Sequence, residues 1–355
     1  MKKKRKKAVL VILIICLVVG FGLFILNAMA RMTFTESITG ESIKAFYQED
    51  RNTLDGIYVG SSAAYRTWDG TQGYEEYGFC IYNMGTYIQP ITMSLPLIKE
   101  CIRLHEDTQV AIVELRNLAK EPNTISDNSL KEITDAMPPS ANRRESIKKF
   151  IEYARLLDLD IDYNTLDYYL PMVRDRGGWI REFELSDLTT PGTLSKTLSK
   201  NQFKGYMPNM ETESFDDPPY VKKQAELEEA DIMILDDFIA FAEESPVEIV
   251  IVVSPHRSYK TKQPTFNAAA DYLEAAGITV LDYNVEPLRS ELDIDWSTCF
   301  YNKRHLNYLG AQAVTGHLSH WISVNMDLPD HRNDPDYSSW NKAASDRAKF
   351  IRAGE

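Results

Sequence analysis

Ser62 is the first side chain in this sequence whose surroundings suggest a nucleophile. It follows the run Ile57–Val59, which is β-branched and aromatic, and the turn residues Gly60 and Ser61. Such a run is typical of a buried strand, and glycine allows a tight turn where a helix can begin. A serine at that point would lie at the carboxyl edge of a sheet, where free N–H groups of a helix start stabilise negative charge on a substrate oxygen. The alternative interpretation is an ordinary strand-to-loop turn capped by serine.

A serine hydroxyl is a weak nucleophile at neutral pH and needs an imidazole within ~2.6–3.2 Å to take its proton. His305 is the preferred base because it precedes the helix predicted from Asn307, on a loop that can return to the sheet edge. Its rival is His256, just beyond an apolar run, beside Arg257 as a candidate for contacting an anionic substrate group. The other histidines are expected in helices, at a helix end or in the tail.

Apolar runs alternate with helical patterns along the chain, which predicts an α/β fold. The run 248–253 is nearly continuous in valine and isoleucine, as in a parallel strand covered on both faces. Right-handed crossovers then place the active cleft at the carboxyl ends of the strands. The predicted strands are 57–59, 79–82, 109–114, 248–253 and 279–282, and the predicted helices are 91–106, 143–157, 227–244, 266–276 (with Gly277 as C-cap) and 307–324.

Three short blocks resemble those of the SGNH or GDSL-like hydrolase family. Gly60–Ser62 is similar to the nucleophile block, and Asn83–Gly85 is similar to the block whose glycine N–H contributes to the oxyanion hole. Asn302–His305 occupies the place of the final Asp-x-x-His block. Asn117 is the nearest candidate for the asparagine of the remaining block, although its Gly-x-Asn context is absent.

This resemblance covers about residues 55–118 and 248–321. It implies a three-layer, flavodoxin-like sandwich around a parallel sheet, with Ser62, Gly85 and Asn117 forming the oxyanion hole and Asn302 assisting His305 as a catalytic residue. No cofactor and no metal are expected.

The sequence departs from the family pattern at Asn302, where the family has an aspartate. Asparagine accepts a hydrogen bond but supplies no negative charge to the imidazolium, and such a loss is costly where the acid is essential. Three explanations remain: a working dyad of Ser62 and His305, an acid supplied by Asp293 or Asp295, or a protein that binds substrate without turnover.

The N-terminus predicts a membrane anchor. Residues 1–7 carry six basic side chains and no acidic one, and residues 8–26 carry no charge and no proline. Nineteen helical residues at ~1.5 Å each span roughly the ~30 Å hydrocarbon core. The basic end would stay in the cytoplasm, giving a single-pass protein whose main domain is extracytoplasmic. Cleavage near Ala28–Ala30 is the alternative.

Charge and cysteine content exclude other classes. With six of the 39 basic residues in the N-terminal tip, 33 remain against 52 acidic ones, a balance of −19 that disfavours nucleic acid as a partner. Cys80, Cys101 and Cys299 lie beyond the predicted anchor, an odd number without metal-type spacing, so a disulfide scaffold is not expected.

The expected organisation is a tip and anchor (1–30), a linker (31–54), an SGNH-like domain (55–325) and a C-terminal tail (326–355). Between 120 and 219 the periodicity is interrupted, and we expect an inserted lid or subdomain that sets substrate choice.

The resemblance and the topology together predict a serine-dependent O-acyltransferase or esterase that acts outside the membrane on a cell-envelope polysaccharide or teichoic acid. Similar membrane-anchored proteins act beside a membrane-bound O-acyltransferase, and the D-alanyl transfer protein of teichoic acid synthesis has a similar layout. The alternative is a non-catalytic subunit that binds or assembles the polymer with a degenerate site.

Overall fold

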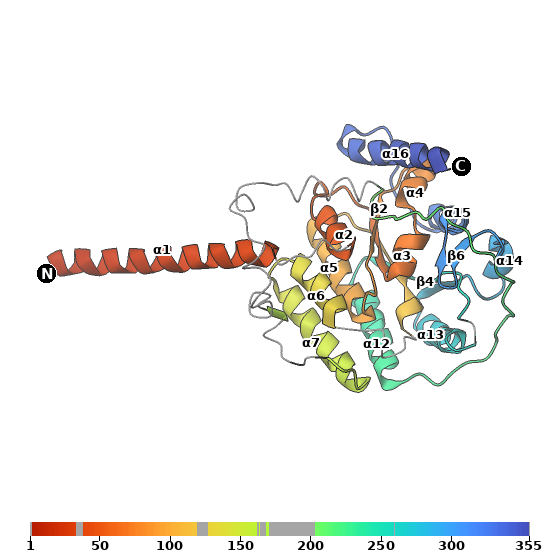
Figure 1. Ribbon diagram of the computed structural model, residues 1–355, viewed down its shortest axis with the longest axis horizontal. Coiled ribbons are helices and arrows are strands. Elements are labelled where there is room, and N and C mark those ends of the chain that lie inside the picture. The colour runs from red at the N-terminus through yellow and green to blue at the C-terminus, as the bar shows by residue number, and fades with distance from the viewer. Residues whose placement is uncertain are drawn as a thin grey trace.

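The computed structural model describes residues 2–32, 38–118, 127–161, 163, 168–169, 203–258 and 260–354. At its centre is a parallel five-stranded sheet in the order β2-β1-β3-β4-β5 (Figure 1). All five strands were predicted. They are β1 (Gly56–Gly60), β2 (Ile81–Gly85), β3 (Val110–Glu114), β4 (Glu248–Val253) and β5 (Thr279–Asp282).

Strand β2 begins two residues later than predicted. The side chain of Asp55 accepts the backbone N–H of Cys80 at 2.6 Å, so a carboxylate takes the donor that a neighbouring strand would otherwise pair. The thiol of Cys80 is buried and free, as is that of Cys101.

Helices cover both faces of the sheet, which establishes the α/β class. Alternate residues of each strand point to opposite faces: Ile57 and Val59 join one core cluster and Tyr58 the other. The first face packs against α2 (Ile38–Phe46), α5 (Ser94–Leu104), α6 (Asp127–Ala136), α7 (Ala141–Leu156), α12 (Glu229–Glu244) and α13 (Gln263–Ala275), and the second against α3 (Ser62–Thr67), α14 (Leu288–Leu292) and α15 (Tyr308–Asn325).

The predicted helices are present with small shifts at their ends. The helix predicted over 91–106 is divided into the 3-10 turn η1 (Ile91–Met93) and α5. Gly277 follows α13 with a φ of 85°, in the left-handed conformation that favours glycine past a helix end.

The predicted linker and tail are packed in their described parts. Helix α2 lies within 31–54, and its Phe46 ring contacts Tyr82 edge-on at 5.5 Å between centroids. Helix α16 (Ser338–Gly354) lies in the predicted tail, packs beside α4 (Gly70–Tyr77) and buries Trp340 completely (Figure 1). Neither helix is predicted from the sequence, because the few large apolar residues in each give a weak periodic signal.

Much of the predicted insertion at 120–219 lies outside the described residues. The described parts are mainly α6 and α7, which join the layer of α5 and α12, and the segment 203–219. That segment runs beside the elements that carry the candidate site: Arg66 of α3 donates to the Met207 carbonyl at 2.6 Å, and Tyr308 N–H to the Asn209 carbonyl at 2.9 Å. The lid stays a prediction.

The N-terminal basic and apolar residues form one helix, α1 (Lys2–Met32), which projects from the domain in Figure 1. Within its described side chains, residues 5–22, the apolar side chains from Val9 to Phe21 are exposed. The described part of the chain contains no helix long and apolar enough to cross a membrane. Residues 23–26 of the predicted anchor lie outside the described side chains.

A buried ion pair joins α16 to α4, and its loss is expected to destabilise the domain. Arg347 Nε lies 2.6 Å from Asp69 Oδ2, and the Asp69 side chain is 1 % exposed. Arg347→Ala would leave that carboxylate buried without its cation, so we expect a loss of about 3–5 kcal/mol in the free energy of unfolding, measured in urea. The surface pair of Lys342 and Asp346, whose lysine side chain is 76 % exposed, provides the control, since Lys342→Ala should change stability by less than about 0.5 kcal/mol. An unchanged Arg347→Ala midpoint would refute the expectation.

Candidate active site

The turn after β1 places Ser62 at the carboxyl edge of the sheet, as predicted. A side chain at Gly60 would lie 2.6 Å from the Glu114 Cβ, so only glycine fits where β1 passes the end of β3. Ser61 is the N-cap residue of α3, and Ser62 is the first residue of that helix. The nucleophile candidate therefore stands where the sheet ends and the helix N–H groups begin.

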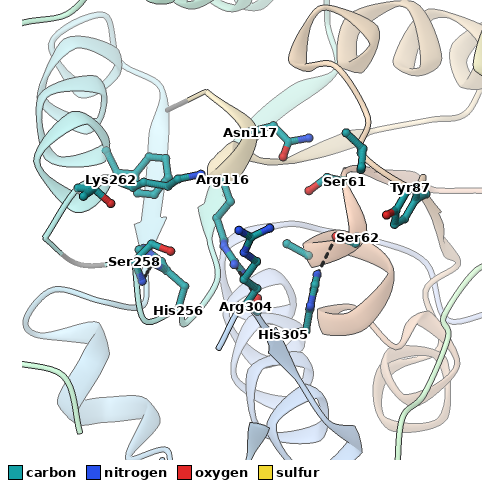
Figure 2. A pocket seen from close by; sticks show the side chains of 14 residues that line it. Ser61, Ser62, Tyr87, Arg116, Asn117, His256, Ser258, Lys262, Arg304 and His305 are labelled. Carbon is teal, nitrogen blue, oxygen red and sulfur yellow. Dashed lines mark hydrogen bonds between the residues drawn. The ribbon is translucent and has the colours of Figure 1, made fainter. Parts of the chain in front are cut away.

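A small hairpin brings His305 to this serine. Strands β6 (Phe300–Asn302) and β7 (His305–Leu306) pair antiparallel, and His305 Nε2 lies 2.7 Å from Ser62 Oγ (Figure 2). That distance is within the range needed for proton transfer. Two segments 243 residues apart thus meet in the contact that the sequence predicted.

Asn302 fixes the tautomer of His305. Its Oδ1 lies 3.0 Å from His305 Nδ1 and also accepts the backbone N–H of Arg304 at 2.8 Å. Because that N–H only donates, the atom facing the imidazole must be the amide oxygen. His305 Nδ1 then carries the proton and donates it to Asn302, which leaves Nε2 free to accept the hydroxyl of Ser62.

The environment keeps His305 neutral. Burial, followed by the positive charges of Arg116, Arg66 and Arg304, lowers its pKa to about 3. The ring of Tyr301 stacks on the imidazole with 5.5 Å between centroids. A neutral imidazole is the form that accepts a proton from serine, but the same cations oppose the imidazolium that forms when it does.

The alternative acids do not contact His305. Asp295 is exposed, and its carboxylate accepts hydrogen bonds from Ser297 and Thr298. Asp293 is also exposed and ends α14 with a φ of 44°. Asn302 is therefore the residue that occupies the place of the triad acid beside His305.

The rival base His256 lines the same cavity but serves as a buried structural residue. Its Nδ1 accepts the Ser258 N–H at 3.0 Å, so its Nε2 donates to Gln263 Oε1 at 3.1 Å. Burial, with Arg116 nearby, holds the pKa of His256 well below its usual value. Arg257 points elsewhere: its guanidinium lies over the Phe215 ring at 4.8 Å and does not line the cavity, which corrects its assignment as an anion contact.

Of the three predicted oxyanion donors, Ser62 and Asn117 line the cavity and Gly85 does not. The Gly85 N–H donates to Asn83 Oδ1 at 2.9 Å and Gly85 does not line the cavity, so its assignment is corrected. Asn117 does line it and donates one amide hydrogen to the Gln89 carbonyl, which leaves the other for a substrate. The N–H of Ser62, at the first position of α3, has no helical partner.

The cavity beside Ser62 has a volume of about 230 Å³ and contains residues that the sequence analysis did not identify. Ile88 lines it with a φ of 51°, a left-handed conformation rare for a β-branched residue and typical of functional loops. Arg116, Lys262 and Arg304 supply positive charge. Arg304 lies inside the block Asn302–His305, and this position is the only feature of the sequence that points to a place in the site.

No protein-family model matches this chain, and no curated protein sequence is significantly similar to it. The resemblance described above therefore rests on the short blocks, and the function is argued from the geometry of the site.

Proposed function

We propose that this protein is a serine-dependent acyltransferase or esterase of the SGNH type. The observation that carries the proposal is the hydrogen-bonded series from Ser62 Oγ through His305 to Asn302 Oδ1, with distances of 2.7 and 3.0 Å. The five-stranded parallel sheet with helices on both faces is compatible with a three-layer SGNH sandwich.

The chemistry follows from these contacts. His305 Nε2 takes the hydroxyl proton of Ser62 as Oγ bonds to the acyl carbon of the donor. The bond to the leaving group breaks, and His305 returns the proton to it. The N–H of Ser62 and the amide of Asn117 stabilise the oxyanion. A hydroxyl of the acceptor, or water, then gives its proton to His305 and bonds to the acyl carbon, while the bond to Ser62 Oγ breaks and His305 returns the proton to Oγ.

The proposed acceptor is a cell-envelope polysaccharide or teichoic acid, and the proposed donor is an acyl group delivered by a membrane-bound O-acyltransferase. The SGNH-like blocks and the basic, apolar N-terminus support this arrangement. No coenzyme A or nucleotide motif occurs in the sequence, which fits a donor supplied by another protein.

A membrane tether with the domain outside the cytoplasm is the matching proposal for location. The exposed apolar side chains of α1 support it. Protease added to intact cells stripped of their wall should degrade the domain after Arg31 and leave a cytoplasmic marker protein intact. Protection of the domain until the cells are lysed would sink this topology.

A fluorophosphonate probe tests the proposed chemistry, because it reacts with an activated serine and not with a serine of ordinary reactivity. A polymer-binding subunit without turnover is the second candidate, favoured by the uncharged Asn302. Labelling at Ser62 supports the enzyme, and retention of polymer by a protein that the probe does not label supports the binding subunit.

A further inference from the structure

The cavity that Ser62 and His305 line carries positive charge, although the protein as a whole has a negative net charge. Arg116, Lys262 and Arg304 line it, and none of the described residues around it is aspartate or glutamate (Figure 2). The chain as a whole carries 52 acidic and 39 basic residues. A random sample of this surface would hold more carboxylates than cations, so the charge of the cavity is a local property.

Hydrogen bonds hold the Arg116 guanidinium in place, and neither arginine of the cavity is paired with a described carboxylate. Arg116 Nη1 donates to Ser254 Oγ at 3.3 Å, and Nη2 donates to the Arg304 carbonyl at 2.6 Å. Among the described residues, neither guanidinium forms an ion pair with a carboxylate within 4.0 Å. A guanidinium has five N–H groups, so both retain donors in the fork geometry that suits phosphate and carboxylate.

The buried side chain of Glu114 orders the turn that carries Arg116. The buried carboxyl of Glu114 accepts the backbone N–H groups of Arg116 and Ser254, both at 3.3 Å, and the hydroxyl of Tyr58 at 3.3 Å. Burial raises the pKa of Glu114, and the charge of Arg116 opposes that rise. Glu114 thus orders the turn that carries Arg116 while remaining out of the cavity.

We propose that Arg116 and Arg304 bind an anionic group, a phosphate or a carboxylate, of the substrate on which Ser62 acts. The inference rests on the proposed function and adds a substrate class: an acceptor whose reactive hydroxyl lies near a fixed negative charge. Neutral polysaccharides fall outside this class.

The same anion would assist the base. Asn302 brings no negative charge to His305, and the cations around the imidazole oppose its protonation. Arg304 directly precedes His305, so an anion bound there offsets part of this positive field and favours the imidazolium that forms during attack. The substrate would in this way supply charge that a triad aspartate supplies elsewhere.

Calorimetric titration of the full chain carrying Ser62→Ala separates binding from chemistry. The probes are glycerol, glycerate and glycerol phosphate, which share hydroxyls and differ in charge. We expect glycerol phosphate, glycerate or both to bind, with affinity falling as salt is raised, and glycerol not to bind. Adding Arg304→Gln or Arg116→Gln should weaken binding about tenfold or more, whereas Arg257→Gln, outside the cavity, should leave it unchanged.

The outcomes are distinguishable. Binding of glycerol phosphate alone indicates a phosphate-bearing acceptor, and binding of glycerate alone a carboxylate-bearing one. Equal affinities for glycerol and both anions, or full affinity in both cavity variants with native unfolding curves, would overturn the anion site. If the anion binds but the probe does not label wild-type Ser62, the acyl-transfer proposal fails while the anion site stands.

Discussion

Ser62→Ala is expected to abolish covalent labelling by a fluorophosphonate and to reduce acyl transfer or ester hydrolysis by about 10³-fold or more. The reason is that the substitution removes the Oγ that lies 2.7 Å from His305 Nε2 and that would form the covalent bond. Labelling is measured by mass spectrometry of the modified peptide and turnover with a chromogenic ester. The residual rate would come from substrate binding and the oxyanion donors alone.

Two further variants test whether the loss of labelling is specific to the Ser62–His305 pair. His305→Ala should leave a serine that is present but poorly activated, so labelling should slow by a comparable factor while the protein remains folded. Ser323→Ala, on the exposed part of α15, is the matched control and should label at the wild-type rate. Full activity in Ser62→Ala would remove the nucleophile assignment and leave the binding-subunit interpretation in its place.

The sequence was sufficient for the parts of the site that follow strand ends. Ser62 follows β1 in a run that is typical of a strand, and His305 lies two residues before the N-cap of a predicted helix. In a parallel sheet these ends share one edge, so their meeting could be expected from topology. The β6–β7 hairpin could not, because strands of three and two residues leave no periodic signal.

The errors arose where a local contact decides the role of a group. Gly85 has the right neighbours, but its N–H is taken by the side chain two residues earlier, at Asn83. Arg116 looks like an ordinary basic residue after a strand, and its place in the cavity is apparent only when the hairpin brings Arg304 beside it. Arg257 adjoins His256 in the sequence, yet its guanidinium lies over the Phe215 ring. Side-chain direction is set by packing, which spacing does not encode.

Asn302→Asp tests whether the missing negative charge beside His305 limits the reaction. The substitution keeps both hydrogen bonds that Oδ1 accepts, from His305 Nδ1 and the Arg304 N–H. It adds a negative charge in contact with the imidazole, which favours the imidazolium of the transition state. We expect kcat/KM for a neutral ester at pH 7 to rise about tenfold or more, since one pKa unit corresponds to a factor of ten.

The pH dependence supplies the independent signature. His305 acts as a base only when unprotonated, and its pKa of about 3 predicts that wild-type kcat/KM shows no acid limb from His305 between pH 5 and 8. A carboxylate at position 302 raises that pKa, so in Asn302→Asp the acid limb should move to higher pH while the plateau rises. Asn325→Asp adds the same charge at the exposed end of α15 and should change neither. An unchanged plateau in Asn302→Asp would show that charge at this position does not limit the reaction and that Asn302 serves to orient His305, and a lower plateau would contradict the expectation.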